Sequence, residues 1–148
     1  MIKKAYIGKS GSGKTHKLLS DLKDIKTRDI FNKESTLVVI LKDEEESFKR
    51  ALPKATFCID DEEIPTGDFD AIVVDTIYMD SKRVEKLAKP NGHLPENVLW
   101  TFQSAKDMAV FFDEATADTF KSVLSKIDED LSVANECVVF EDKRGIKS

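Results

Sequence analysis

The segment Gly8-Lys9-Ser10-Gly11-Ser12-Gly13-Lys14-Thr15 carries the strongest pattern in the chain. It follows the short apolar run Ala5-Tyr6-Ile7 and precedes leucines at helical spacing. Its three glycines allow the backbone to bend and to bring N–H groups close to an anion. A helix that begins near Lys14 would point the positive end of its dipole at the same anion. The segment therefore predicts a phosphate-binding loop between a strand and a helix.

The spacing of this loop matches G-x-x-x-x-G-K-[ST], the P-loop of nucleotide-binding proteins. Lys14 is expected to reach the β- and γ-phosphates as a point charge, and the Thr15 hydroxyl is expected to bind Mg²⁺. We expect ATP rather than GTP, because the chain has no Asn-Lys-x-Asp motif for reading guanine. The residues assigned to the nucleotide are Gly8, Lys9, Ser10, Gly11, Ser12, Gly13, Lys14, Thr15 and His16.

Strand-like and helical segments alternate along the rest of the chain. The expected strands are Lys4–Ile7, Thr36–Leu41, Thr56–Ile59, Ala71–Asp75, Val98–Phe102 and Glu136–Phe140. Several are near-continuous apolar runs, as in parallel strands buried on both faces. Helical spacing between them involves Leu18, Leu19, Leu22 and Ile25; Phe48 and Leu52; Val84, Leu87 and Ala88; and Phe120, Val123, Leu124, Ile127 and Leu131. The pattern predicts one α/β domain over residues 1–148, a three-layer fold with a mainly parallel sheet flanked by helices.

Composition limits the class of protein. The 148 residues are 41% hydrophobic and 34% charged, with a formal net charge of −5, which is unlike the basic footprint of a dedicated nucleic-acid binder. No apolar run approaches the ~18 residues of a membrane span, and we expect a cytoplasmic protein without a membrane partner. Cys58 and Cys137 lack metal-ligand spacing, so we expect both to be reduced core residues.

The carboxylates suggest a metal ligand and a catalytic base. Asp75 ends an apolar strand, where an Asp of a P-loop protein holds Mg²⁺ together with the loop hydroxyl, here that of Thr15. Thr76 follows, where many ATPases have the Glu that orients the attacking water. Two acidic clusters, Asp43-Glu44-Glu45-Glu46 and Asp60-Asp61-Glu62-Glu63, could supply this base, and we favour Glu44 or Glu45.

Two further segments bear on the site. Phe111-Phe112-Asp113-Glu114 looks like a strand that ends in an Asp-Glu pair, but the spacing of Ala105, Met108, Ala109 and Phe112, with Ser104 as N-cap, predicts a helix instead. Val98–Phe102 ends at Gln103, whose amide could sense the γ-phosphate.

The order of these pieces resembles the RecA, KaiC and replicative-helicase branch of P-loop ATPases. The matching pieces are Gly8–Thr15, Leu37–Glu46, Ala71–Thr76, Val98–Gln103 and Cys137–Arg144. The resemblance implies Mg-dependent ATP hydrolysis coupled to conformational change or assembly, with Lys14, Glu44 or Glu45, and Gln103 as catalytic residues. It also implies a homo-oligomer in which Arg144, or less favourably Arg83, reaches the neighbouring subunit's nucleotide.

Other functions stay open at this level. DNA-translocating ATPases also carry a Gln after the corresponding strand, so nucleic acid remains a candidate partner. A regulatory switch with little hydrolysis is favoured by Thr76 at the position of the usual Glu. A small-molecule kinase is disfavoured, because its Arg-rich lid has no counterpart among the scattered Arg28, Arg50, Arg83 and Arg144.

Overall fold

A computed structural model describes residues 2–9, 12–77, 81–88, 95–103 and 137–141. Its elements are β1 (Lys3–Ile7), α1 (Lys14–Asp21), α2 (Ile25–Phe31), β2 (Thr36–Ile40), the 3₁₀ turn η1 (Lys42–Glu44), α3 (Glu45–Ala51), β3 (Thr56–Ile59), β4 (Ala71–Asp75), α4 (Ser81–Ala88), β5 (Asn97–Phe102) and β6 (Val138–Glu141). Strands and helices alternate along this part of the chain, as the sequence predicts for an α/β protein.

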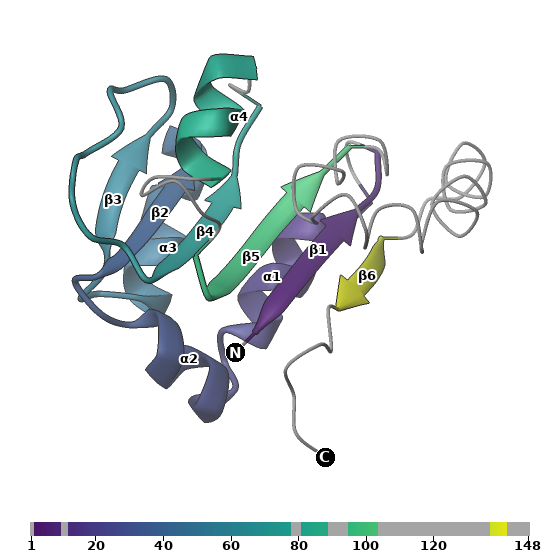
Figure 1. Ribbon diagram of the computed structural model, residues 1–148. Helices are drawn as coiled ribbons and strands as arrows, with labels where there is room; N and C mark the ends of the chain where they lie inside the picture. Colours follow the sequence, from purple (N-terminus) through teal and green to yellow (C-terminus); the bar gives the residue numbers. More distant parts are fainter. Residues whose placement is uncertain (1, 10–11, 78–80, 89–94, 104–136, 142–148) are drawn as a thin grey trace.

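The strands form a six-stranded sheet in the order β3-β2-β4-β5-β1-β6 (Figure 1). β1 to β5 pair in parallel, and β6 pairs antiparallel with β1 at one edge. Ile7 lies opposite Phe102, and Ile40 lies opposite Asp75. The carboxyl ends of β1, β2, β4 and β5 therefore meet along one edge of the sheet, where open α/β sheets usually bind their ligands.

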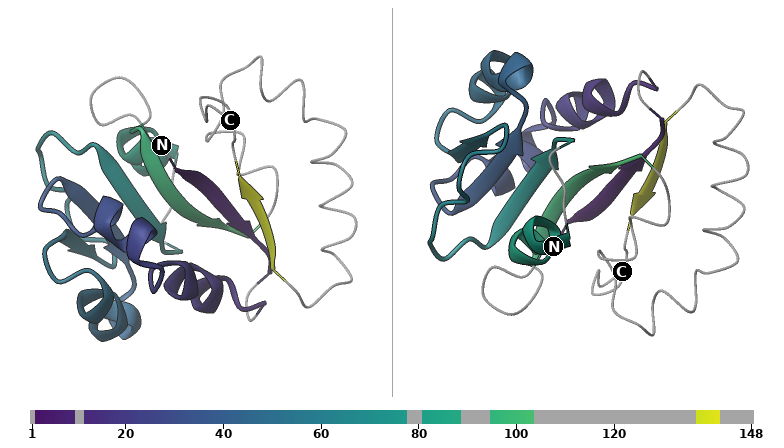
Figure 2. Two further views of the ribbon diagram at one scale, coloured as in Figure 1. Left: turned by 90° about the horizontal axis from the view of Figure 1, so that it is seen from below. Right: turned by 90° about the horizontal axis from the view of Figure 1, so that it is seen from above.

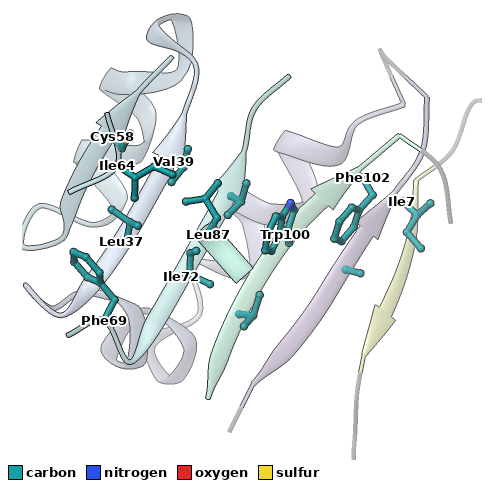
Figure 3. Packing of buried hydrophobic residues seen from close by; sticks show 13 residues of the cluster. Ile7, Leu37, Val39, Cys58, Ile64, Phe69, Ile72, Leu87, Trp100 and Phe102 are labelled. Carbon is teal, nitrogen blue, oxygen red and sulfur yellow. The ribbon is translucent and has the colours of Figure 1, made fainter. Parts of the chain in front are cut away.

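Helices cover both faces of the sheet. α1, α2 and α3 lie on one face (Figure 2). They contribute Leu18, Phe31 and Phe48 to a buried cluster that includes the strand residues Tyr6 and Val38. On the other face, α4 contributes Leu87, which packs in a second cluster with aromatic and aliphatic side chains of the strands (Figure 3). The three-layer α/β arrangement predicted from the buried apolar runs is confirmed for the described residues.

The strand predictions hold to within one or two residues at each end. Two expectations about Thr36–Leu41 and Ile25 need correction. Leu41 leaves the strand and becomes the N-cap of η1. Ile25 does not continue the apolar face of α1, because α1 ends at Asp21 and the side chain of Asp24 accepts a hydrogen bond from the backbone N–H of Thr27. This cap starts a new helix, and Ile25 is left 73% exposed.

Several predicted features fall on residues that the structure does not describe. The helical stretch after Ser104 and the amphipathic stripe from Phe120 to Leu131 lie outside the described residues, as do the side chains of Val84 and Ala88. None of the described helices is both long enough and apolar enough to cross a membrane.

Candidate functional site

The glycine loop begins where β1 meets β5. The backbone N–H of Gly8 donates to the carbonyl oxygen of Phe102 at 3.1 Å, which continues the β1–β5 pairing past the end of the strand. A Cβ on residue 8 would lie 2.3 Å from the Ser12 Oγ atom, so this position accepts only glycine without rearrangement.

Gly13 provides the turn from the loop into α1. Its φ of 88° is left-handed, and it is the N-cap of α1. Its carbonyl oxygen accepts the first helical bond, from the N–H of Lys17 at 3.0 Å. The Ser12 Oγ atom is buried and has no hydrogen-bond partner among the described residues. Buried hydroxyls in folded proteins usually have a hydrogen-bond partner. The Ser12 hydroxyl is therefore consistent with a loop in which a bound group supplies the missing partner. Ser10 and Gly11 lie outside the described residues.

Lys14 is the first residue of α1 and points back across the end of β5. Its Nζ atom donates to the Phe102 carbonyl oxygen at 3.4 Å. Partial burial lowers the pKa of the Lys14 amine, while the nearby charges of Asp75 and Cys137 act in the opposite direction. Within the described residues this long contact to a neutral carbonyl is the one hydrogen bond of the Lys14 amine, and a partly buried cation gains more from an anion than a solvated lysine would.

Thr15 and Asp75 are 60 residues apart in sequence and meet at the sheet edge. The Thr15 hydroxyl donates to Asp75 Oδ2 at 2.6 Å. The other carboxylate oxygen, Oδ1, accepts from the Thr101 hydroxyl at 3.0 Å. Both oxygens of Asp75 are therefore oriented by threonines, one from α1 and one from β5. Thr15 and Asp75 are predicted from the sequence, but Thr101 is not, because its only signal is a hydroxyl inside an otherwise apolar strand.

The donor set at this point fits a magnesium ion better than a transition metal. The described residues contain no group of three or more His, Cys, Asp or Glu side chains placed to hold a metal. Thr15 and Asp75 offer one hydroxyl and one carboxylate, which are hard oxygen ligands. Mg²⁺ characteristically takes one or two such protein ligands and completes its octahedron with water and phosphate oxygens. The site would thus need a phosphate-bearing ligand to hold the ion.

Of the two favoured bases, Glu44 is the one that approaches Asp75. Since β2 ends at Ile40, opposite Asp75, the following η1 turn lies beside the metal-binding candidate. Partial burial raises the pKa of the Glu44 carboxyl, and the negative charges of Asp75 and Asp43 raise it further. Glu45 instead forms ion pairs with Lys42 at 2.8 Å and Lys49 at 3.1 Å, which lower its pKa.

The second acidic cluster, Asp60–Glu63, is hydrogen-bonded to the segment that leads into Glu44. Asp60 has a φ of 54°, which is unusual outside glycine, although aspartate tolerates it better than most residues. Its N–H donates to the Ile40 carbonyl oxygen and its carboxylate accepts from the Lys42 N–H, both at 2.8 Å. Asp60 therefore ties together the last residue of β2 and the first residue of η1. The Glu62 carboxylate accepts from the Ile59 N–H, so it too is used within the turn.

Arg83, the less favoured candidate for reaching a neighbouring nucleotide, contacts its own chain. Its guanidinium donates to the carbonyl oxygens of Asp60 and Glu62, each at 2.9 Å. It also donates to the Cys58 Sγ atom at 3.6 Å. These contacts join α4 to the turn after β3.

The remaining predicted residues are as follows. Gln103 is exposed directly after β5, at the same sheet edge, and His16 is exposed on α1. Cys58 and Cys137 are buried thiols that form no disulfide in the described part of the chain, as predicted, and burial raises the pKa of both. Asp113, Glu114 and Arg144 lie outside the described residues.

Comparisons with known proteins add no relative. No protein-family model, no curated protein and no solved structure matches the chain.

Proposed function

We propose that this chain is a minimal RecA-like P-loop ATPase that binds Mg-ATP and hydrolyses it. The observation that carries the proposal is the 2.6 Å hydrogen bond between the Thr15 hydroxyl and the Asp75 carboxylate. In P-loop NTPases these two residue types, one after the loop lysine and one at a strand end, hold the same Mg²⁺. A loop that matched the motif by chance would have no reason to lie against such a carboxylate.

The surrounding residues supply the other parts of the reaction. Lys14 would stabilise phosphate charge, since it is half-desolvated and has only a 3.4 Å contact to a carbonyl oxygen. Glu44 would orient and polarise the attacking water, because it lies close enough to Asp75 to have its pKa raised by it. Gln103, exposed at the same edge, would sense the γ-phosphate. Bound Mg²⁺ would supply charge neutralisation on the phosphate oxygens.

Nucleotide binding is tested by titration with a fluorescent ATP analogue, with and without Mg²⁺. We expect Lys14→Ala to lose most of the affinity, and Asp75→Asn to keep magnesium-free binding while it loses the gain from Mg²⁺. Lys26→Ala is the matched control, since Lys26 is an exposed lysine on α2. Binding of wild-type strength in folded Lys14→Ala would show that the glycine loop does not hold the phosphates.

Hydrolysis is tested by multiple-turnover phosphate release, with and without DNA. Glu44→Gln should lower the rate by about 10²–10⁴ while ATP binding persists, the usual effect of removing a general base. Glu45→Gln is the control on the next residue, because the Glu45 carboxylate is paired with Lys42 and Lys49. Equal loss in both variants would point to a structural effect of the acidic turn, and full activity in both would remove this segment from the reaction.

A regulatory switch with little hydrolysis is the second candidate. It is favoured by Thr76, which follows Asp75 where many ATPases have the catalytic Glu. Hydrolysis would then need a base from a separate segment, which in this chain would be Glu44. Tight magnesium-dependent binding, negligible turnover in the wild type, and different protease protection with ATP and with ADP would support the switch over the ATPase.

The same phosphate-release assay tests two candidate partners, a second copy of the chain and DNA. A homo-oligomer that completes its site with a residue of the neighbouring subunit should show specific activity that rises with protein concentration. Arg144→Ala should abolish this rise. Activity per molecule that stays constant with concentration would assign hydrolysis to the monomer.

A further inference from the structure

A cleft of about 460 Å³ is lined by residues of the three helices that cover one face of the sheet and by the residues that follow α1. α1, α2 and α3 run along that face together (Figure 2). The lining residues are His16, Leu19, Ser20, Leu22, Lys23, Arg28, Ser47, Arg50 and Ala51. Leu19, Leu22 and Ala51 are buried or half-buried and form the floor, and the other side chains are exposed around it. An apolar floor with a few polar groups around it is the usual make-up of a small-molecule site.

The charge of this cleft is opposite to that of the whole chain. Three cationic side chains, Lys23, Arg28 and Arg50, line it together with an imidazole, and no acidic side chain of the described residues does. The chain as a whole carries a net charge of −5. Within the described residues, neither Lys23 nor Arg28 forms an ion pair. Arg50 pairs with Glu46 at 2.9 Å, but both side chains are largely exposed, and such pairs contribute little free energy.

The cationic end of the cleft is separate from the phosphate loop. α1 runs from Lys14 to Asp21, and its eight residues span about 12 Å at ~1.5 Å each. Lys23 follows the far end of this helix, so a phosphate held by Lys14 cannot also contact Lys23 or Arg28. Among the described residues no aromatic side chain lines the cleft, although single-stranded nucleic acids are commonly bound by stacking on aromatic rings.

We propose that this cleft is a second anion-binding site, which takes a small ligand carrying two or more phosphate groups. Arg28 and Arg50 can bind phosphate oxygens through two parallel N–H groups, and Lys23 adds a point charge. The hydroxyls of Ser20 and Ser47 are further donors on opposite helices, α1 and α3. The volume is in the range of ~300–1,000 Å³ that small-molecule sites occupy, so the ligand is a compact polyanion.

The test uses the full chain with Lys14→Ala, so that the glycine loop does not compete for the probe. Inorganic pyrophosphate, without Mg²⁺, is titrated into this protein by calorimetry at ~0.15 M salt. We expect saturable binding that Lys23→Gln with Arg28→Gln weakens about tenfold or more, because two charge-assisted contacts are lost. Lys26→Gln with Lys54→Gln is the matched control, which removes the same charge from exposed lysines outside the cleft.

Two results would overturn the proposal. One is the absence of saturable pyrophosphate binding, or an equal loss in both double variants, which would indicate only a diffuse response to net charge. The other is tight binding of an oligothymidylate that Lys23→Gln with Arg28→Gln abolishes while pyrophosphate does not compete, which would make the cleft a nucleic-acid surface. Neither result depends on whether the glycine loop of the unmodified protein binds ATP, which is measured separately.

Discussion

Replacing Thr101 by valine should show whether the hydrogen bond from Thr101 orients the Asp75 carboxylate for binding Mg²⁺, or whether Asp75 merely ends a strand. The substitution keeps the shape of a buried side chain and removes the hydroxyl that donates to Asp75 Oδ1 at 3.0 Å. Thr36 on β2 provides a matched control. It is also a buried strand threonine, but its Oγ1 atom has no hydrogen-bond partner in the described part of the chain.

The two valines should have effects of opposite sign. A hydrogen bond to a charged group contributes about 1.5–3 kcal/mol to stability. Asp75 is half-buried and water can replace part of this bond, so we expect Thr101→Val to cost about 1–2 kcal/mol. Thr36→Val removes a desolvated hydroxyl without a partner, so it should be neutral or stabilising by up to ~1 kcal/mol.

Urea unfolding at pH 7 without nucleotide measures both free energies. The same proteins are then titrated with Mg²⁺ in the presence of the ATP analogue, and Thr101→Val should weaken the dependence on Mg²⁺ while Thr101→Ser largely restores it. A Thr101→Val protein as stable as Thr36→Val, with an unchanged magnesium requirement, would refute the role given to the Thr15–Asp75–Thr101 contacts.

Three further predictions concern the loop, the base and the helix that carries Lys14. Gly8→Ala should destabilise the protein by about 1–3 kcal/mol through overpacking on the Ser12 hydroxyl, and Ser12→Gly in the same chain should recover most of this loss in urea unfolding. Glu44→Gln should raise Tm at pH 7 in magnesium-free buffer, because a raised folded-state pKa makes wild-type stability fall as pH rises from the ordinary 4.5 through that pKa. The gain should vanish below about pH 4, where the Glu44 carboxyl is protonated in both states, and a gain independent of pH would contradict this account. Tyr6→Phe should cost about 1–2 kcal/mol, since the buried Tyr6 hydroxyl donates to the Asp21 carboxylate at the end of α1; an unchanged unfolding midpoint would show that this contact does not hold the helix.

The buried strands could be predicted from the sequence because their apolar runs are a strong local pattern. The runs Leu37–Leu41 and Ala71–Val74 are apolar without alternation, and such runs are stable only when both faces of a strand are covered. The segment Gly8–Thr15 predicts a phosphate loop because the geometry of phosphate binding requires glycines and a lysine at these positions. Ile25 was misassigned because its helical spacing competed with a capping interaction of Asp24, which the apolar pattern does not reveal.

The sequence by itself determined the α/β class, and it predicted a phosphate loop at Gly8–Thr15 with Asp75 as its candidate partner. Only the tertiary structure decided which side chains meet. The register sets Ile40 opposite Asp75 and so brings the segment after β2 beside it, while Glu45 is taken up in ion pairs with Lys42 and Lys49. The contact of Thr101 with Asp75 follows from the place of β5 beside β4. These contacts join residues distant in sequence, and strand order and register are fixed by the packing of the whole sheet, so no local pattern encodes them.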